Sequence, residues 1–525
     1  MRDFQTPGRS AVFAQNGMCA TSHPLAAQVA IDILKRGGNA MDAAIAGAVV
    51  LGFCEPQMTG IGGDCFVLMS PAGQDNVVGM NASGTAPLGA RADRLRARGV
   101  QQIKHDTPES ITIPAAVDGL CQMSEKWGKL GLDTILQPAI HYAEEGVPVA
   151  PRVASDWKDD CGHLNEAARN FYLSDGKPLK TGDIFRAPQQ AEVLRRIAKQ
   201  GRSAFYSGEV AEDMVGSLRA AGGVHQLADF AALKAFETTP ISGSYKAHDL
   251  LEHPPNGQGA TAHLILNILS HFDLSTMDPF GVKRTHIEAE ATKLAYDTRN
   301  RFLSDPDHMR KLDHMLSLET ASKLAALIDP KRAIANTTSI SESVHKDTVY
   351  ITVVDKDRMS VSLIYSIFHG FGSGIASEKF GILFHNRGSG FTLTPGHPNE
   401  YGPGKRPMHT IIPGMLAKQG RVVMPFGVMG GEYQANGHAR LLTNMLDYGM
   451  NPQAAIDGPR AFAYDGVLNL ERGHAPDVAQ RLADMGHKIA TPGTAIGGAQ
   501  AIYLHESGVL EGGSDPRKDG CALGY

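Results

Sequence analysis

Thr348 is the residue of this chain around which chemistry could be organised. A polar run, residues 336–347, precedes it, and β-branched and aromatic residues follow as far as Val354. This change of pattern predicts a loop that leads into a β-strand beginning at Thr348. If the peptide bond after Asp347 were cleaved, the new α-amine, with a pKa of about 7.7–8, could act as the base for the neighbouring hydroxyl. A threonine that opens a strand is otherwise an ordinary strand former, so the pattern alone leaves both interpretations open.

Other reaction centres find little support in the sequence. No Gly-x-Ser-x-Gly segment of the kind that carries a serine nucleophile occurs. The 21 histidines form no His-x-x-x-His pair and no combination with cysteine at the spacing of metal ligands. Scattered histidines are therefore interpreted as structural; examples are His141, His248, His263 and His286. We predict no catalytic metal and no cofactor.

Short motifs extend over almost the whole chain in an order that one enzyme family shares. They are residues 37–44 (GGNAMDAA), 60–64 (GIGGD), 254–259 (PPNGQG), 348–357 (TVYITVVDKD), 381–383 (GIL), 405–407 (KRP), 430–431 (GG), 458–460 (GPR) and 514–517 (SDPR). By these motifs the sequence resembles the γ-glutamyltransferase family of N-terminal-nucleophile hydrolases. The resemblance implies an α/β fold, a four-layer αββα sandwich of the N-terminal-nucleophile hydrolase type.

The resemblance also implies that the chain cleaves itself between Asp347 and Thr348. Cleavage would give a large fragment, residues 1–347, and a small fragment, residues 348–525, which begins with the nucleophile. The two fragments together would form one compact catalytic unit, a heterodimer. Pairing of two such units into a dimer of heterodimers is left open.

Three further residues match the family's catalytic machinery. Gly430 and Gly431 correspond to a glycine pair whose backbone N–H groups point at the oxyanion. An ordinary turn would use the same glycines, but a paired-glycine loop after a strand predicted at 421–426 lets the backbone approach a substrate closely. Ser366 stands where the family has a threonine that hydrogen-bonds the nucleophile, and it keeps the hydroxyl.

The positions with which the family holds a glutamyl substrate differ in this chain. Residues 81–85 lack the arginine that binds the substrate's α-carboxylate, and Gly390 replaces the aspartate that binds its α-amine. Losing two charged contacts disfavours a zwitterionic glutamyl group. The predicted substrate-binding residues are the replacements Arg387 (for Gln), Phe368 (for Asn), and His409 and Thr410 (for a Ser pair), together with Tyr350.

Arg387 indicates which substrate could bind instead. A guanidinium binds a carboxylate through two parallel hydrogen bonds, so Arg387 is predicted to face a small anionic amide, although a structural ion pair would explain it as well. Within the family this pattern resembles the oxamate amidohydrolase branch, which cleaves a small amide carrying a carboxylate beside its carbonyl. The alternatives are a γ-glutamyl hydrolase or transferase acting on glutathione-like substrates, and an inactive binding protein, against which the retained Thr348 and Ser366 argue.

Composition excludes several other classes of protein. The 525 residues are 42% hydrophobic and 20% charged, as in ordinary globular enzymes, and the net charge of −5 offers no basic surface for nucleic acid. Residues 1–17 lack the apolar core of an export signal, and the apolar run 41–54 is too short to span a bilayer. We therefore expect a cytoplasmic protein that does not contact membranes, with its six cysteines as free thiols.

Hydrophobic periodicity predicts the elements that position these residues. Strands are expected at 17–21, 65–69, 241–252 and 421–426, and in a hairpin formed by the strand from Thr348 and residues 361–368. Helices are expected at 24–36, 41–53, 114–129, 133–146, 188–199, 208–221, 258–272, 283–303, 435–448, 452–456 and 475–485. The helix 283–303 carries Glu288, Glu290, Lys293 and Arg299, which are interpreted as a solvated face.

Overall fold

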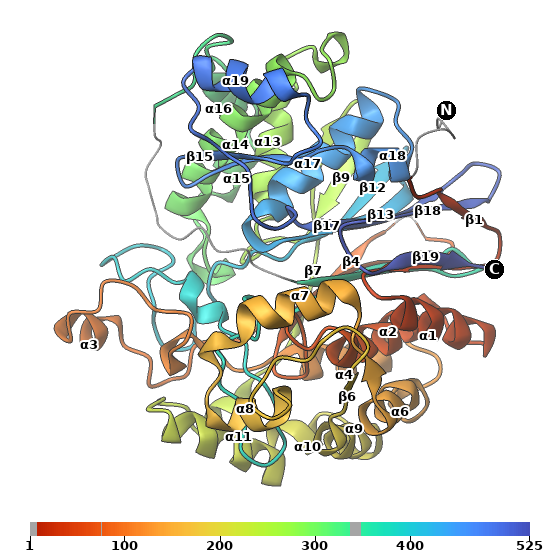
Figure 1. Cartoon of the computed structure of the whole chain (residues 1–525), viewed down its shortest axis with the longest axis vertical. Helices are drawn as coiled ribbons and strands as arrows, with labels where there is room; N and C mark the ends of the chain where they lie inside the picture. Colours follow the sequence, from red (N-terminus) through yellow and green to blue (C-terminus); the bar gives the residue numbers. More distant parts are fainter. Residues whose placement is uncertain (1–7, 75, 336–347) are drawn as a thin grey trace.

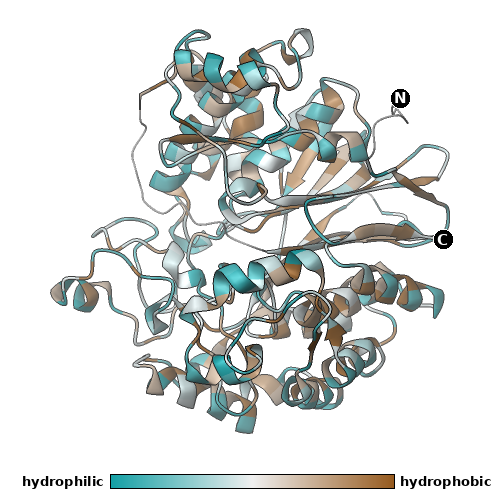
Figure 2. Ribbon diagram, in the orientation of Figure 1, coloured by the Kyte–Doolittle hydropathy of each residue, from teal (hydrophilic) through white to brown (hydrophobic). Residues whose placement is uncertain are grey.

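The computed structural model describes residues 8–74, 76–335 and 348–525. Two seven-stranded sheets lie face to face at its centre, and helices cover the outer face of each (Figure 1). In Figure 2 the helices on the outside carry many teal residues, whereas the strands between them are mostly brown or white. This arrangement confirms the predicted four-layer αββα sandwich. Asp347, the predicted cleavage residue, lies outside the described residues.

Both central sheets are antiparallel throughout, and the strand that follows Thr348 is central in the first of them. Sheet 1 has the order β19 (Cys521–Gly524), β2 (Met18–Thr21), β10 (Val349–Val354), β11 (Ser360–Ser366), β3 (Asp64–Ser70), β4 (Val78–Ala82), β7 (Phe236–Thr238). Sheet 2 has the order β1 (Val12–Ala14), β18 (Leu510–Ser514), β17 (Gly498–Leu504), β13 (Arg421–Met429), β12 (Pro413–Lys418), β9 (His248–Glu252), β8 (Ile241–Tyr245). Two small sheets hold β14 (Ala461–Tyr464), β15 (Val467–Leu470) and β16 (Ile489–Ala490), and β5 (Val147–Pro148) and β6 (Ile184–Phe185).

The helical layer on sheet 1 is built around α2 (Ala40–Cys54). The Asn39 side chain accepts from the Asp42 N–H at 3.0 Å, and the Asp42 carboxylate accepts from the Asn39 N–H at 3.1 Å, so a capping box starts the helix. Every residue of α2 is buried, and the helix packs on β10 and β11. An evenly apolar helix is stable only in such a buried position.

The other helices of the first half of the chain are α1 (Pro24–Lys35), α3 (Ala92–Ala97), η1 (Pro108–Ser110), α4 (Ala116–Trp127), α5 (Leu132–Ile135), α6 (Gln137–Glu145), α7 (Pro151–Asp160), η2 (Cys161–His163), α8 (Glu166–Tyr172), α9 (Pro188–Gln200), α10 (Ser203–Tyr206), α11 (Gly208–Ala220) and α12 (Leu227–Ala232). The later helices are α13 (Gly259–Leu269), η3 (Leu274–Thr276), α14 (Val282–Phe302), η4 (Pro306–His308), α15 (Leu312–Leu316), α16 (Leu318–Ala325), η5 (Arg387–Gly390), η6 (Gly431–Tyr433), α17 (Gln434–Leu446), α18 (Pro452–Asp457) and α19 (Pro476–Asp484). In Figure 1, α13, α14 and α17 lie on the outer side of sheet 2.

The prediction that the charged residues of α14 form a solvated face is wrong. Glu288 and Glu290 are 1% and 0% exposed, and Arg299 is 2% exposed. Glu288 accepts from Arg440 of α17 at 2.7 Å, and Arg299 pairs with Glu432 of η6. These partners come from distant parts of the sequence, and pairing is what allows charged groups to be buried.

The two sheets approach each other closely beside the start of β10. Side chains alternate along a strand, so Thr348 and Tyr350 share one face and Val349 and Ile351 the other. Val349 and Ile351 belong to the core that includes α2, whereas Tyr350 packs between the sheets with Met429 of β13. A Cβ atom at Gly427 would lie 2.3 Å from the Tyr350 ring, so only glycine permits this approach.

Most predicted elements are confirmed within a few residues, with two exceptions. Residues 241–252 form a hairpin of two strands, because Lys246 and Ala247 make a turn with positive φ angles. Neither residue is glycine, so the sequence does not indicate this turn. The helix predicted at 133–146 is two helices, and Pro138 lies in the first turn of the second. All six cysteines are free, as predicted. Among the described residues, no helix combines the length and the apolar character that crossing a bilayer requires.

Candidate active site

Thr348 and Ser366 meet at one end of the central hairpin of sheet 1. Val349 of β10 pairs with Tyr365 of β11, which places Thr348 opposite Ser366 on the face between the sheets. Their hydroxyl oxygens lie 3.2 Å apart, and both residues are fully buried. The register of the hairpin thus brings together the two hydroxyls that the sequence predicted as nucleophile and partner.

The contacts of Ser366 fix the direction of this hydrogen bond. A serine hydroxyl has one proton and two acceptor lone pairs. Its oxygen accepts from Arg387 Nη2 at 3.2 Å and from the Phe368 backbone N–H at 2.9 Å. The single proton of Ser366 is therefore left for Thr348 Oγ1, which accepts it. Thr348 keeps its own proton free for transfer to a base.

Arg387 lies two hydrogen bonds from the Thr348 oxygen and is fully buried. Its Nη1 donates to Thr410 Oγ1 at 2.9 Å, and the Phe368 ring centre lies 3.9 Å from its Cζ, a cation–π contact. Its Nε has no hydrogen-bond partner among the described residues. Burial lowers the pKa of Arg387 to about 9, with Asp64 acting in the opposite direction, so the guanidinium is charged at neutral pH.

A buried carboxylate, Asp64, lies beside this cation. It is the first residue of β3 and pairs in register with Ser366. Its Oδ1 accepts from the Gly84 N–H at 3.1 Å, and its Oδ2 contacts His409 Nε2 at 3.1 Å. Burial raises the pKa of Asp64, but its interactions with His385, its hydrogen bond with His409 and the nearby Arg387 cation outweigh this, so the net pKa lies below its usual value.

The two histidines around Asp64 are neutral near pH 7. Burial lowers the pKa of His409 to about 3 and also lowers that of His385. His385 Nε2 donates to the Thr112 carbonyl at 2.9 Å, and its Nδ1 accepts from the Arg387 N–H at 3.3 Å. The neutral rings leave Arg387 as the charged group that faces the hydroxyls.

The Gly430-Gly431 pair joins β13 to the helical segment η6–α17. Gly430 has φ +115° and Gly431 φ +53°, and a Cβ atom on Gly430 would lie 2.7 Å from the Cα of Gly497. The first N–H groups of a helix have no acceptor inside it and carry a partial positive charge. The backbone here is therefore suited to stabilising a developing negative charge.

Gln258 ties this loop to the hydroxyl cluster. Its Nε2 donates to the Thr410 carbonyl at 2.7 Å and to the Gly431 carbonyl at 3.1 Å. Its Oε1 accepts from Arg299 at 2.8 Å, and Arg299 also pairs with Glu432. A chain of contacts thus leads from Gly431 through Thr410 to Arg387.

The predicted substrate-binding residues occupy different positions. Arg387, Phe368 and Thr410 form one cluster with Ser366, and Phe368 has a positive φ of +82°. His409 is joined to Asp64, as described above. The Tyr350 hydroxyl instead bonds Ser362 at 2.8 Å between the sheets.

Sequence reasoning missed four residues that organise the site, namely Asp64, Gln258, Arg299 and His385. Asp64 and Gln258 stand inside the motifs 60–64 and 254–259, so the signal was present, but the motifs do not reveal what these side chains contact. The sequence predicts Arg299 on a solvated face. Its partners lie 41 and 133 residues away, beyond the reach of any local pattern.

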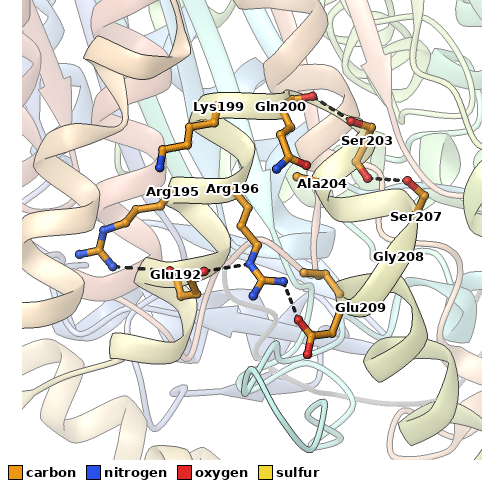
Figure 3. Close-up of a pocket in the computed structure, with 11 residues that line it drawn as sticks. Glu192, Arg195, Arg196, Lys199, Gln200, Ser203, Ala204, Ser207, Gly208 and Glu209 are labelled. Atoms are coloured by element: carbon orange, nitrogen blue, oxygen red, sulfur yellow. Dashed lines mark hydrogen bonds and ion pairs between the residues drawn. The ribbon is translucent and has the colours of Figure 1, made fainter.

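A surface pocket of about 480 Å³ between α9 and α11 does not belong to this site (Figure 3). Of its cations, Arg196 pairs with Glu192 at 2.9 Å and with Glu209 at 2.8 Å. None of the predicted site residues lines it. It is a charged surface depression, whereas Thr348 and Ser366 lie at the buried end of the central hairpin.

Comparisons with known proteins match the whole chain. The family model described as gamma-glutamyltranspeptidase matches residues 26–525. The Glutathione hydrolase-like YwrD proenzyme of Bacillus subtilis (strain 168) is 34% identical over 98% of this chain and 99% of its own length. The Oxamate amidohydrolase proenzyme of Klebsiella pneumoniae is 33% identical over 97% of this chain and 98% of its own.

One solved structure is similar to this chain over almost the full length of both proteins. The cephalosporin acylase of Bacillus halodurans superimposes with a TM-score of 0.93 at 36% sequence identity, covering 100% of this chain and 99% of that one. The printed names of these three proteins refer to different substrates, namely glutathione, oxamate and a cephalosporin.

Proposed function

The chain belongs to the gamma-glutamyltranspeptidase family, and on this premise we propose that it is an autoprocessing threonine amidohydrolase acting on a small anionic amide such as oxamate. The observation that carries the proposal is the placement of Arg387, a buried cation that bonds the same hydroxyl, Ser366, as the nucleophile does. The catalytic groups would be Thr348, Ser366, Gly430 and Gly431.

Self-cleavage comes first in the proposed mechanism. Thr348 Oγ1 attacks the carbonyl carbon of Asp347, the amide nitrogen leaves as the new α-amine, and water hydrolyses the resulting ester. The products are residues 1–347 and 348–525, which remain together as a heterodimer. The names of the relatives as proenzymes support this step.

The amide reaction uses the same hydroxyl in two stages. Thr348 Oγ1 attacks the substrate carbonyl while its proton passes to its own α-amine. The N–H groups of Gly430 and Gly431 stabilise the oxyanion, and the α-ammonium returns the proton to the departing ammonia. Water then hydrolyses the threonine ester. For oxamate the overall change is oxamate and water to oxalate and ammonia.

Ser366 and Arg387 contribute to this step by their orientation. Because Ser366 donates to Thr348 Oγ1, it stabilises the oxygen as its proton leaves. Arg387 holds Ser366 in that orientation and presents positive charge where a carboxylate next to the scissile carbonyl must lie. Phe368 covers one face of the guanidinium, which leaves its edge for a planar carboxylate.

A second candidate is hydrolysis of a γ-glutamyl amide, favoured by the relatives that are named glutathione hydrolases. Such a substrate also needs an anion for its α-amine. In the described site Asp64 is engaged by Gly84 and His409, and Glu432 pairs with Arg299. Using either carboxylate would require breaking contacts that organise the site.

The test measures kcat/KM of purified, cleaved protein for oxamate by ammonia release. γ-Glutamyl-p-nitroanilide, glutathione and a glutaryl amide serve as competing substrates. The proposal expects oxamate or another short anionic amide to be preferred. A strong preference for γ-glutamyl compounds would establish the second candidate instead.

A further inference from the structure

Three potential metal ligands meet on the far side of sheet 2, outside the site described above. His286 and Glu290 are four residues apart and lie on one face of α14, and His487 follows α19. His286 Nδ1 lies 2.8 Å from His487 Nε2, and His487 Nε2 lies 3.8 Å from Glu290 Oε1. One ligand atom from each residue falls within 4.8 Å of the others, and all three residues are buried.

Neighbouring groups already orient two of these side chains as ligands are oriented in metal sites. His286 Nε2 donates to the Asp329 carbonyl at 2.7 Å, so Nδ1 carries the lone pair that points into the cluster. Glu290 Oε2 accepts from the Ile334 N–H at 2.7 Å, which leaves Oε1 facing His487. A carbonyl behind a histidine and an N–H behind a carboxylate are typical outer contacts of bound metals.

His487 has an unused nitrogen that would accommodate metal binding. Among the described residues, His487 Nε2 is the group that contacts His286 Nδ1, so without a metal Nε2 carries the proton. Its Nδ1 is buried and has no partner among the described residues. When Nε2 binds a cation, the proton moves to Nδ1, and the ring remains neutral.

We propose that His286, Glu290 and His487 bind one divalent transition-metal cation of the Zn²⁺ class, with water as a fourth ligand. Two imidazoles and one carboxylate are a donor set typical of Zn²⁺. Bonds of about 2.0–2.1 Å in tetrahedral geometry place ligand atoms roughly 3.3 Å apart. The nitrogens must separate slightly and the carboxylate must move inward, which side-chain rotation allows.

Lys293 is the group that must give way. Its Nζ lies 2.7 Å from Glu290 Oε1, and its side chain is 16% exposed against 0% for Glu290. The ammonium can therefore turn towards water when a cation takes its place on the carboxylate. Metal binding thus exchanges one positive partner of a buried carboxylate for another.

The three proposed ligands would lie in different fragments of the cleaved protein. If cleavage occurs before Thr348, as proposed above, His286 and Glu290 lie in the large fragment and His487 in the small one. A shared ion would then join the two fragments through coordination bonds. The binding itself does not depend on cleavage, so the two proposals can fail separately.

The experiment titrates metal-free protein with Zn²⁺ by calorimetry and with Co²⁺ by visible absorption, which reports tetrahedral coordination. Wild type is compared with His487→Gln, Glu290→Gln and the control His474→Gln. His474 is another buried histidine of the same fragment, held by the carbonyls of Phe280 and Arg460. The Thr348→Ala chain is titrated in parallel to separate binding from cleavage.

We expect about one Zn²⁺ per chain in wild type, His474→Gln and Thr348→Ala, and binding at least about tenfold weaker in the two cluster variants. Zn²⁺ should also raise the denaturant concentration at which the fragments of wild type separate. Absence of a stoichiometric site, or unchanged binding in His487→Gln, would overturn the proposal. Should the cluster variants fail to fold, X-ray absorption of Zn²⁺-loaded wild type decides, because fewer than two histidine ligands would also overturn it.

Discussion

The groups that surround Thr348 and the groups that hold them in place come from different parts of the chain. Ser366 and Arg387, which share the hydrogen bonds next to the nucleophile, both follow it in the sequence. Asp64 contacts His409, and Gln258 donates to the carbonyl of Thr410. Both Asp64 and Gln258 precede Thr348 in the sequence. In the proposed mechanism Ser366 and Arg387 act at the nucleophile, whereas Asp64 and Gln258 hold the neighbouring residues in place.

This difference teaches where substitutions should act. Changes in the region that follows Thr348 should alter the rate of bond cleavage. Substitutions of Asp64 and Gln258, which precede Thr348, should mainly alter the stability of the fold and the geometry of the site. The variants below either sharpen this division or remove it.

The largest effect is expected for Thr348→Ala. Without the hydroxyl there is no nucleophile for self-cleavage or for the substrate, so the chain should stay in one piece and show no measurable turnover. Gel electrophoresis and ammonia release check this. Thr348→Ser is the matched control and should still be cleaved. A Thr348→Ala chain that is cleaved and active would show that Thr348 is not the nucleophile, and the comparison between its neighbours and the residues that hold them would lose its basis.

Gly431→Ala should reduce turnover by about 10²–10³ fold, the usual cost of losing one oxyanion donor. Alanine tolerates φ +53° poorly, so the loop that presents the N–H groups must shift. Gly420→Ala, in the turn between β12 and β13, imposes a comparable backbone strain with nothing within 4 Å of the new Cβ. Equal kcat in the two variants would show that the loop does not serve the oxyanion.

Arg387→Gln should lower kcat/KM for oxamate by about 10- to 100-fold, since a hydrogen bond to a charged group is worth about 1.5–3 kcal/mol. Self-cleavage should slow as well, because Arg387 orients Ser366. Arg406→Gln is the control, a partly buried arginine whose guanidinium bonds the carbonyls of Ser83 and Lys234. Unchanged kinetics of Arg387→Gln on anionic amides would show that Arg387 does not bind the substrate.

The smallest effect on rate is expected for Asp64→Asn, whose signature is the pH dependence of stability. The folded pKa of Asp64 lies below its ordinary value, so its charge stabilises the fold fully above about pH 4 and is lost as pH falls through the lowered pKa. The difference in thermal midpoint between wild type and Asp64→Asn should be constant from pH 8 to 5 and shrink below pH 4. A difference that does not change with acidification would mean that this carboxylate is not stabilised by its neighbours.

The Thr348–Ser366 pair shows what the sequence could predict. The family resemblance pairs Ser366 with Thr348, and the hairpin, in which Val349 pairs with Tyr365, brings the two hydroxyls within 3.2 Å of each other. Arg387 and Thr410 are both predicted to bind the substrate, and in the structure they bond each other; the sequence does not predict the hydrogen bond from Arg387 to Ser366. It depends on how η5 packs against the hairpin.

The charged residues of α14 show where local reasoning fails. Their spacing is that of an exposed helix, yet Glu288 and Arg299 are buried because Arg440 and Glu432 approach from elsewhere. The same holds for Glu290, whose neighbour His487 lies almost 200 residues further along. Pairing between distant segments is set by tertiary packing, which no window of sequence contains.

The central claim is that Thr348 becomes the N-terminus and the nucleophile, and the intact mass of the purified protein tests it most directly. The account predicts two polypeptides, of which the smaller has the mass of residues 348–525, and a mass increase on that fragment alone when the acyl intermediate is trapped by acid quench. A fragment beginning at any other residue, or an active protein that remains a single chain, would contradict it.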